Sequence, residues 1–112
     1  MKLTNSITEK KYKNELKRGA RYLLAEAGDP ELLAFLCEEI GVIESVYYLS
    51  GYKLADYHTC ILLVNREVIC HVEISGGVVE TYKSMSVSEY RRGLKNQGQI
   101  KLEVALELAA LE

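Results

Sequence analysis

The sequence contains no tryptophan, one phenylalanine and a single proline among its 112 residues. The lone proline and the lack of low-complexity tracts exclude a proline-rich linker and a collagen-like repeat. No apolar run approaches the roughly 20 residues that cross a bilayer, so we expect no membrane-spanning helix. Cysteine is also sparse and odd in number. Cys37, Cys60 and Cys70 are therefore expected to be reduced thiols rather than a disulfide framework.

Short motifs typical of enzymes are missing as well. There is no phosphate-cradling glycine loop, no serine-centred nucleophile elbow, no Cys-x-x-Cys pair and no zincin helix. The stretch Met1–Ser6 lacks the apolar run of a secretory signal, which predicts a cytoplasmic protein. A hydrophobic fraction of 48% and a charged fraction of 27% are typical of folded chains. The length suits one domain, residues 1–112, and Leu111-Glu112 resembles a cloning remnant.

Two helices are predicted at the start of the chain. Ser6 with Glu9 forms a capping-box pattern, and apolar residues then recur at three- and four-residue spacing up to Gly28. Asp29-Pro30 supplies an N-cap and a proline at the first helical position. A second helix should therefore begin at once and end at Gly41.

Strands and further helices are predicted beyond Gly41, where the pattern becomes alternating and β-rich. Ser86 with Glu89 is a second capping box, which opens a helix to about Lys95. The predicted strands are Ile43–Ser50, His58–Val64, Glu67–Ser75 and Ser75–Lys83, with Gly51–Tyr57 as a connection and Gln99–Ala110 as a final apolar helix. The predicted fold is α+β, with two N-terminal helices, an antiparallel four-stranded meander sheet and one or two C-terminal helices.

The two tight turns predict which strand residues share a face. A two-residue loop at Asn65-Arg66 pairs Cys60 with His71, and a two-residue loop at Gly76-Gly77 pairs His71 with Tyr82. All helices then pack on one face, and the mixed outer face carries His58, Cys60, His71, Glu73 and Tyr82. The alternative is a three-residue loop at residues 65–67, which moves His58 and Cys60 to the core face. We prefer the two-residue loop because it keeps His58 away from apolar neighbours.

The predicted outer face groups residue types that can carry chemistry. Cys60 opposite His71 has the surroundings of an activated thiol, and Tyr82 is a third candidate catalytic residue. The side chains of His58, Cys60, His71 and Glu73 are all acceptable zinc ligands. Neither set has motif spacing, so packing and hydrogen bonding are the favoured roles. No cofactor is expected.

Tyrosine is abundant, with eight residues, and four of them gather around the first strand: Tyr47, Tyr48, Tyr52 and Tyr57. Such clusters are common at protein interfaces. The last helix is apolar over more than half its circumference, which leaves Leu102 and Leu106 without an obvious cover. A second copy would cover them, which predicts a homodimer. The alternative is a monomer in which this helix covers the other sheet face.

Positive charge is concentrated in the first helix. The candidate nucleic-acid contacts are Lys10, Lys13, Lys17, Arg18 and Arg21, although the net charge of −2 disfavours such a partner. The sequence therefore predicts a non-enzymatic protein-binding or regulatory module, expected to be homodimeric and without a membrane partner. The alternative is a small RNA-acting, metal-dependent or thiol-dependent enzyme that uses the outer sheet face and this basic segment.

Overall fold

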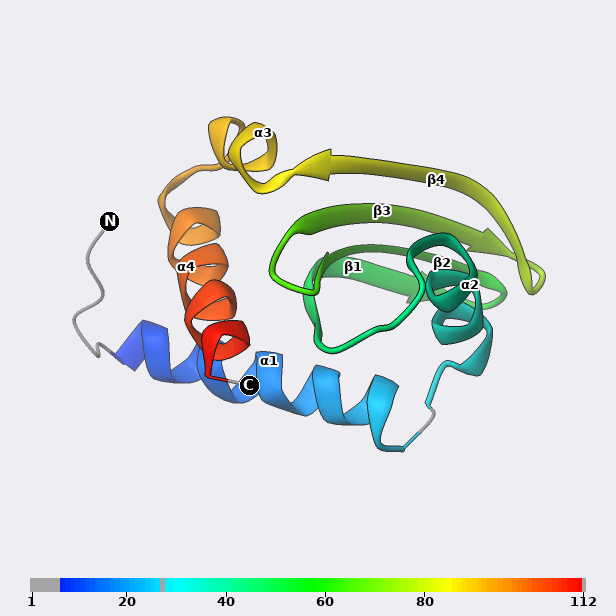
Figure 1. Ribbon diagram of the computed structural model, residues 1–112, viewed down its shortest axis with the longest axis horizontal. Coiled ribbons are helices and arrows are strands. Elements are labelled where there is room, and N and C mark those ends of the chain that lie inside the picture. Colours follow the sequence, from blue (N-terminus) through cyan, green and yellow to red (C-terminus); the bar gives the residue numbers. More distant parts are fainter. Residues whose placement is uncertain (1–6, 27, 112) are drawn as a thin grey trace.

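The computed structural model describes residues 7–26 and 28–111 and has the predicted α+β fold (Figure 1). Two helices precede an antiparallel sheet in the order β1-β2-β3-β4, and two helices follow it. No helix in the described ranges combines the length and the apolar character needed to cross a membrane. The elements are α1 (Ile7–Leu24), α2 (Pro30–Ile40), β1 (Val46–Leu54), β2 (Tyr57–Val64), β3 (Val68–Ser75), β4 (Val78–Ser86), α3 (Val87–Arg92) and α4 (Asn96–Ala110).

Local capping signals set the starts of the helices. The Asp29 carboxylate accepts a hydrogen bond from the backbone N–H of Leu32, with proline as the first residue of α2. The capping box of Ser86 and Glu89 forms at α3 as predicted, whereas Ser6 lies outside the described residues. The last helix begins at Asn96, earlier than predicted, because the Lys95 carbonyl accepts from the N–H of Gln99 and closes a first turn.

Strand β1 extends farther along the chain than predicted. It continues through Gly51, which sequence reasoning placed in a connection, and ends at Leu54. The backbone of Gly51 has φ of 151°, and a Cβ there would lie 2.4 Å from the carbonyl oxygen of Thr59 on β2. Glycine at this position therefore lets β1 stay paired with β2 beyond a bulge near Ser50.

The register between β2 and β3 differs from the preferred prediction, and the three-residue loop forms. Val64 pairs with Val68, so Cys60 lies opposite Val72 rather than opposite His71. The Gly76-Gly77 turn forms as predicted. A bulge between that turn and the middle of β4 then shifts the partners, so that His71 pairs with Lys83 and not with Tyr82.

Asn65 explains the three-residue loop. Its backbone is left-handed (φ 51°), as asparagine tolerates. Its amide group donates to the Val42 carbonyl at 2.8 Å and accepts from the N–H groups of Glu44 (2.6 Å) and Ser45 (3.2 Å). The conformation of Asn65 is thus fixed by a loop about twenty positions earlier in the chain. The sequence of the turn alone does not indicate these contacts.

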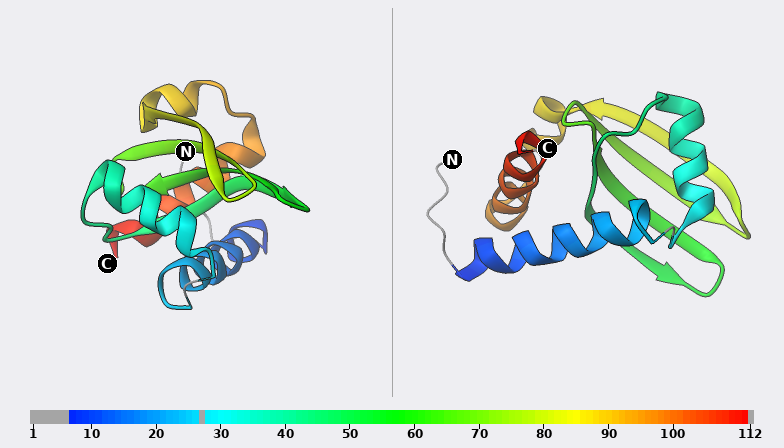
Figure 2. Two further views of the ribbon diagram at one scale, coloured as in Figure 1. Left: turned by 90° about the vertical axis from the view of Figure 1, so that its right-hand side faces the viewer. Right: turned by 60° about the horizontal axis from the view of Figure 1, so that its bottom comes forward.

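Helices cover both faces of the sheet, so the prediction of a single covered face is wrong. Helix α2 packs over the face that carries Cys60 and Val72, whereas α4 and the first half of α1 pack against Leu63 and Ile69 (Figure 2). The middle strands are apolar on both faces. Consecutive residues Leu62, Leu63 and Val64 are all fully buried, which is typical of strands between two covering layers.

Candidate functional site

The residues considered for thiol or metal chemistry are divided between the two sheet faces. Cys60 and Tyr82 belong to the cluster under α2, and His58 is tied to the start of that helix. His71 and Glu73 point to the opposite face, beyond the part that α4 covers. The predicted outer face is therefore not formed, because the register places β2 one residue away from the assumed pairing. Among the described residues, no group of three or more His, Cys, Asp and Glu side chains could hold a metal ion.

Cys60 is a buried thiol without an activating partner. It is 1% exposed, and burial, followed by the negative charge of Asp29 and by Cys70, raises its pKa to about 12. A catalytic cysteine needs the opposite shift, because the thiolate is the nucleophile. The predicted Cys60–His71 arrangement is absent from the structure, and Cys60 contributes to the core instead.

Tyr82 joins β4 to α2. Its ring packs edge-on against Phe35 with centroids 5.1 Å apart, and its hydroxyl lies 3.7 Å from the Cys70 sulfur. Burial raises the pKa of Tyr82 to about 12, so the hydroxyl remains protonated at neutral pH. These contacts describe a packing residue.

His58 is oriented by a carboxylate. Its Nδ1 lies 3.1 Å from Oδ2 of Asp29, whose other oxygen caps α2, so one aspartate joins β2 to the helix. The pair borders a surface cavity of about 340 Å³ that Lys53 and Asp56 also line. A histidine whose imidazole is oriented by a carboxylate has the arrangement of a general base. The thiol two residues along on the same strand is protonated, so the pair activates no cysteine nucleophile.

His71 and Glu73 belong to a polar network on the sheet face beyond α4. The His71 Nε2 atom lies 3.3 Å from Oγ1 of Thr59 and 3.6 Å from Oε1 of Glu73. Tyr57 donates a hydrogen bond to Oε2 of Glu73 at 3.2 Å, and its ring packs against Tyr52 with centroids 5.9 Å apart. All members are at least partly exposed, and the network stiffens this end of the sheet.

The predicted tyrosine cluster separates into buried and exposed members. Tyr47 is 3% exposed and Tyr48 is half-buried, with burial as the main cause of its strongly raised pKa. Neither ring is freely available to a partner. Tyr52 is 56% exposed, and the half-buried Tyr57 lies beside it. The sequence did not distinguish these pairs, because it placed Tyr52 in a connection and not on the exposed outer part of β1.

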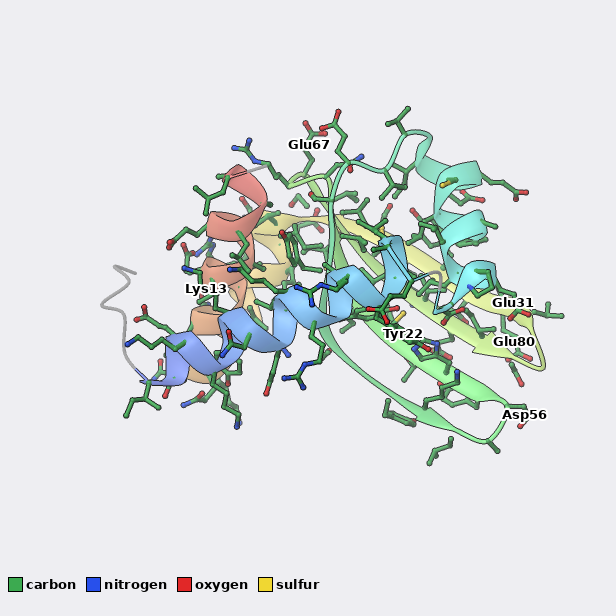
Figure 3. The ribbon with its side chains drawn as sticks, turned by 90° about the horizontal axis from the view of Figure 1, so that it is seen from below. Lys13, Tyr22, Glu31, Asp56, Glu67 and Glu80 are labelled. Atoms are coloured by element: carbon green, nitrogen blue, oxygen red, sulfur yellow. The ribbon has the colours of Figure 1, made fainter. Side chains whose placement is uncertain are left out.

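The β1–β2 hairpin projects beyond the helices. We call its outer part, residues 50–57, the arm; Figures 2 and 3 show it extending past the end of α1, with Asp56 at its tip. Every residue from Ser50 to Leu54 is exposed. Leu54 is 63% exposed and lies on the same side of the strand as Tyr52. Sequence reasoning missed Leu54 because it placed this segment in a loop, where alternation carries no meaning.

The last helix does not leave the predicted apolar residues uncovered. Leu102 is fully buried and Leu106 is half-buried, both in the cluster that α4 forms with α1 and the sheet. The apolar residues predicted to form a dimer surface on α4 are therefore covered within the chain, because the helix packs against a sheet face as the alternative prediction placed it. The reason is that α1 lies alongside α4, so that one helix covers the other.

Positive charge lies along α1, as predicted. Lys10, Lys17, Arg18 and Arg21 are exposed, whereas Lys13 is half-buried on the side near α4 (Figure 3). None of the ion pairs within the described ranges includes any of these five residues. The cations are thus available to an anionic group from another molecule.

Comparison of the chain with protein-family models, with curated proteins and with solved structures finds no match.

Proposed function

We propose that this protein is a non-enzymatic protein-binding module, and that its arm receives an extended segment of a partner protein. The observation that carries the proposal is the exposure of Tyr52 and Leu54, on one side of a projecting edge strand. Strand β1 is at the edge of the sheet, so its outer main-chain groups are available for pairing along the exposed half. A partner strand would gain hydrogen bonds from this edge and apolar contact from the two side chains.

The stiffness of the arm supports this role. Tyr57 and Glu73 join β2 to β3 by a hydrogen bond, and the N–H of Gly76 donates to the Asp56 carbonyl at 2.9 Å, which links the two hairpin ends. A surface held in its binding conformation loses less entropy when a partner binds. The protonated, buried state of Cys60 also favours a binding module over the thiol-dependent alternative. Free thiols at Cys60 and Cys70 support a reducing, cytoplasmic setting.

A displayed library of random peptides tests the proposal. Peptides selected on the wild-type protein should alternate apolar residues, and their affinity should fall at least about tenfold in a Tyr52→Ser, Leu54→Ser double variant. Val78→Ser is the matched control, because Val78 is equally exposed but lies on the other hairpin. Nuclear magnetic resonance should place the peptide-induced shifts in residues 50–54. Peptides that bind the double variant as well as the wild type would contradict the proposal.

A labelled single-stranded RNA separates this proposal from the nucleic-acid alternative. If the arm is the binding site, RNA should not compete with the selected peptides, since no cluster of cations lies on the arm. RNA binding that is lost in a Lys17→Glu, Arg21→Glu variant, with no peptide bound by the arm, would favour the alternative.

A further inference from the structure

A groove with an apolar lining and cationic residues lies along the second half of α1. Its volume is about 350 Å³, and its apolar residues are Ala20, Leu24, Ala25 and Tyr47. Lys17 and Arg21, one helical turn apart, also line it. Leu24 remains 38% exposed, so part of the apolar lining is in contact with solvent.

The two cations have no anionic partner within the described part of the chain. Both acids of α1 are engaged elsewhere: Glu9 is buried, and Glu15 lies 4.0 Å from Lys101 of α4. No ion pair includes Lys17 or Arg21. A groove with an apolar lining and cations that lack an anionic partner fits an apolar side chain flanked by carboxylates.

The same molecule presents a surface of that complementary type. Val42, in the loop between α2 and β1, is 79% exposed, and Glu38 and Glu44 on either side of it in the sequence are exposed as well. Residues 38–44 include three glutamates and no lysine or arginine. We call this segment, which is the end of α2 together with the loop that follows it, the acidic loop.

The acidic loop is held rigidly although its apolar side chain is exposed. Asn65 accepts hydrogen bonds from the N–H groups of Glu44 and Ser45 and donates one to the Val42 carbonyl. Three bonds from one side chain fix the backbone on both sides of Ile43. An exposed valine on a fixed backbone is suited to insertion into a groove, because little entropy remains to be lost.

We propose that the groove of α1 receives the acidic loop of a second copy of this chain. Val42 of one copy enters the apolar groove of the other, and Glu38 and Glu44 face Lys17 and Arg21. The contact is self-complementary, so a two-fold axis forms it twice. Tyr47, which lines the groove, is five residues after Val42, so the two surfaces are at most about 18 Å apart along the chain. This spacing suits a single compact interface. The interface is separate from the arm and does not depend on the proposed function.

Charge-swap complementation tests the proposal. Two variants are prepared, Lys17→Glu with Arg21→Glu, and Glu38→Lys with Glu44→Lys. Each alone should weaken the wild-type dimer at least about tenfold, because like charges then face each other in both contacts. Mixed in equal amounts, they should form a heterodimer, since every contact again joins opposite charges. Sedimentation velocity measures all three samples, and circular dichroism confirms that each variant is folded.

The control and the salt dependence complete the experiment. The control variant is Lys83→Glu with Arg92→Glu, at exposed residues away from the groove. It changes the net charge by the same amount as Lys17→Glu with Arg21→Glu, and it should leave the dimer intact. Raising the salt from about 0.1 M to about 1 M should weaken the dimer, because the Debye length falls from about 10 Å to about 3 Å. A wild-type monomer at high protein concentration and low salt overturns the proposal. So does a dimer that both variants leave unchanged, or a mixture that fails to associate. None of these three results would contradict the proposed binding of peptides by the arm.

Discussion

His58 and Cys60 lie two residues apart on one face of β2, and their surroundings differ strongly. The imidazole is near the sheet margin, where Asp29 orients it and a cavity opens beside it. The thiol lies under α2, 1% exposed, and its pKa is about 12. The two residues therefore differ in how deeply they lie beneath α2: His58 links β2 to the helix, and Cys60 packs in the core. Residue type alone made both residues candidates for thiol or metal chemistry, although packing and hydrogen bonding were the favoured roles.

The thiols should react at very different rates. Cys37 is exposed, whereas Cys60 and Cys70 are buried and have raised pKa values. With a thiol-specific alkylating reagent at mildly alkaline pH, one group per chain should react at once, and the other two should react only after unfolding. Intact-mass spectrometry counts the modified groups, and peptide mapping should locate the first at Cys37. Rapid modification of Cys60 in the folded protein would show that its environment activates it.

At the scale of elements, α4 is the helix whose role the sequence suggested least accurately. Its apolar residues surround much of its circumference, which pointed to a second copy as the missing cover. In the structure α1 and the sheet supply that cover, and Leu102, Ala105 and Ala109 are all buried. A helix that packs against another helix and a sheet needs a wider apolar stripe than one on a surface.

Substitution of Leu102 distinguishes a core residue from an interface residue. Leu102→Ala should lower the free energy of unfolding by about 2–5 kcal/mol through lost burial and a cavity. Leu102→Glu should abolish cooperative folding, because it buries an unpaired charge. Denaturant titration followed by circular dichroism measures both. Leu111→Glu, at a position 74% exposed just past the helix, is the control and should leave stability nearly unchanged. A folded Leu102→Glu protein with a changed oligomeric state would restore the interface interpretation.

The whole molecule closes its core within one chain. Its radius of gyration is 13.6 Å, close to the value of about 13 Å for a compact domain of this length. Both sheet faces have helical cover. Among the described residues, uncovered apolar surface is confined to the arm, the groove of α1, the acidic loop and a few scattered residues. Both hydrophobic clusters are therefore built from residues of this chain.

Stability of the whole molecule should decrease at alkaline pH. The pKa of Cys60 rises from 9.0 to about 12 on folding, and burial also raises the pKa of Tyr48 and Cys70. Well below pH 9 these groups are neutral in both states, so their contribution to stability is constant there. Above that pH the unfolded chain loses protons that the folded chain retains, and the free energy of unfolding falls as pH rises toward 12.

Denaturant midpoints measured across this pH range check the prediction. A Cys60→Ala variant should be less stable at neutral pH, and its stability should fall less steeply above pH 9, since one of the ionising groups is gone. Cys37→Ala, at an exposed position, should follow the wild-type curve. Equal slopes for Cys60→Ala and wild type would show that Cys60 does not carry the effect.

The sequence by itself determined the order of the helices and strands, because its signals are local. The Asp29-Pro30 cap, the Ser86–Glu89 capping box and the Gly76-Gly77 turn each act over a few residues, and each forms. Apolar alternation likewise located most of the strands, with errors where Gly51 permits a close approach to β2.

Only the tertiary structure decided which residues meet. Asn65 takes its conformation from bonds to residues 42–45, and one added loop residue moved Cys60 away from His71 and under α2. Because side chains alternate along a strand, this single step reassigned every residue of β2 to the other face. The candidate chemical site disappeared for that reason. The arm, the groove and the acidic loop became visible because exposure depends on contacts between distant parts of the chain.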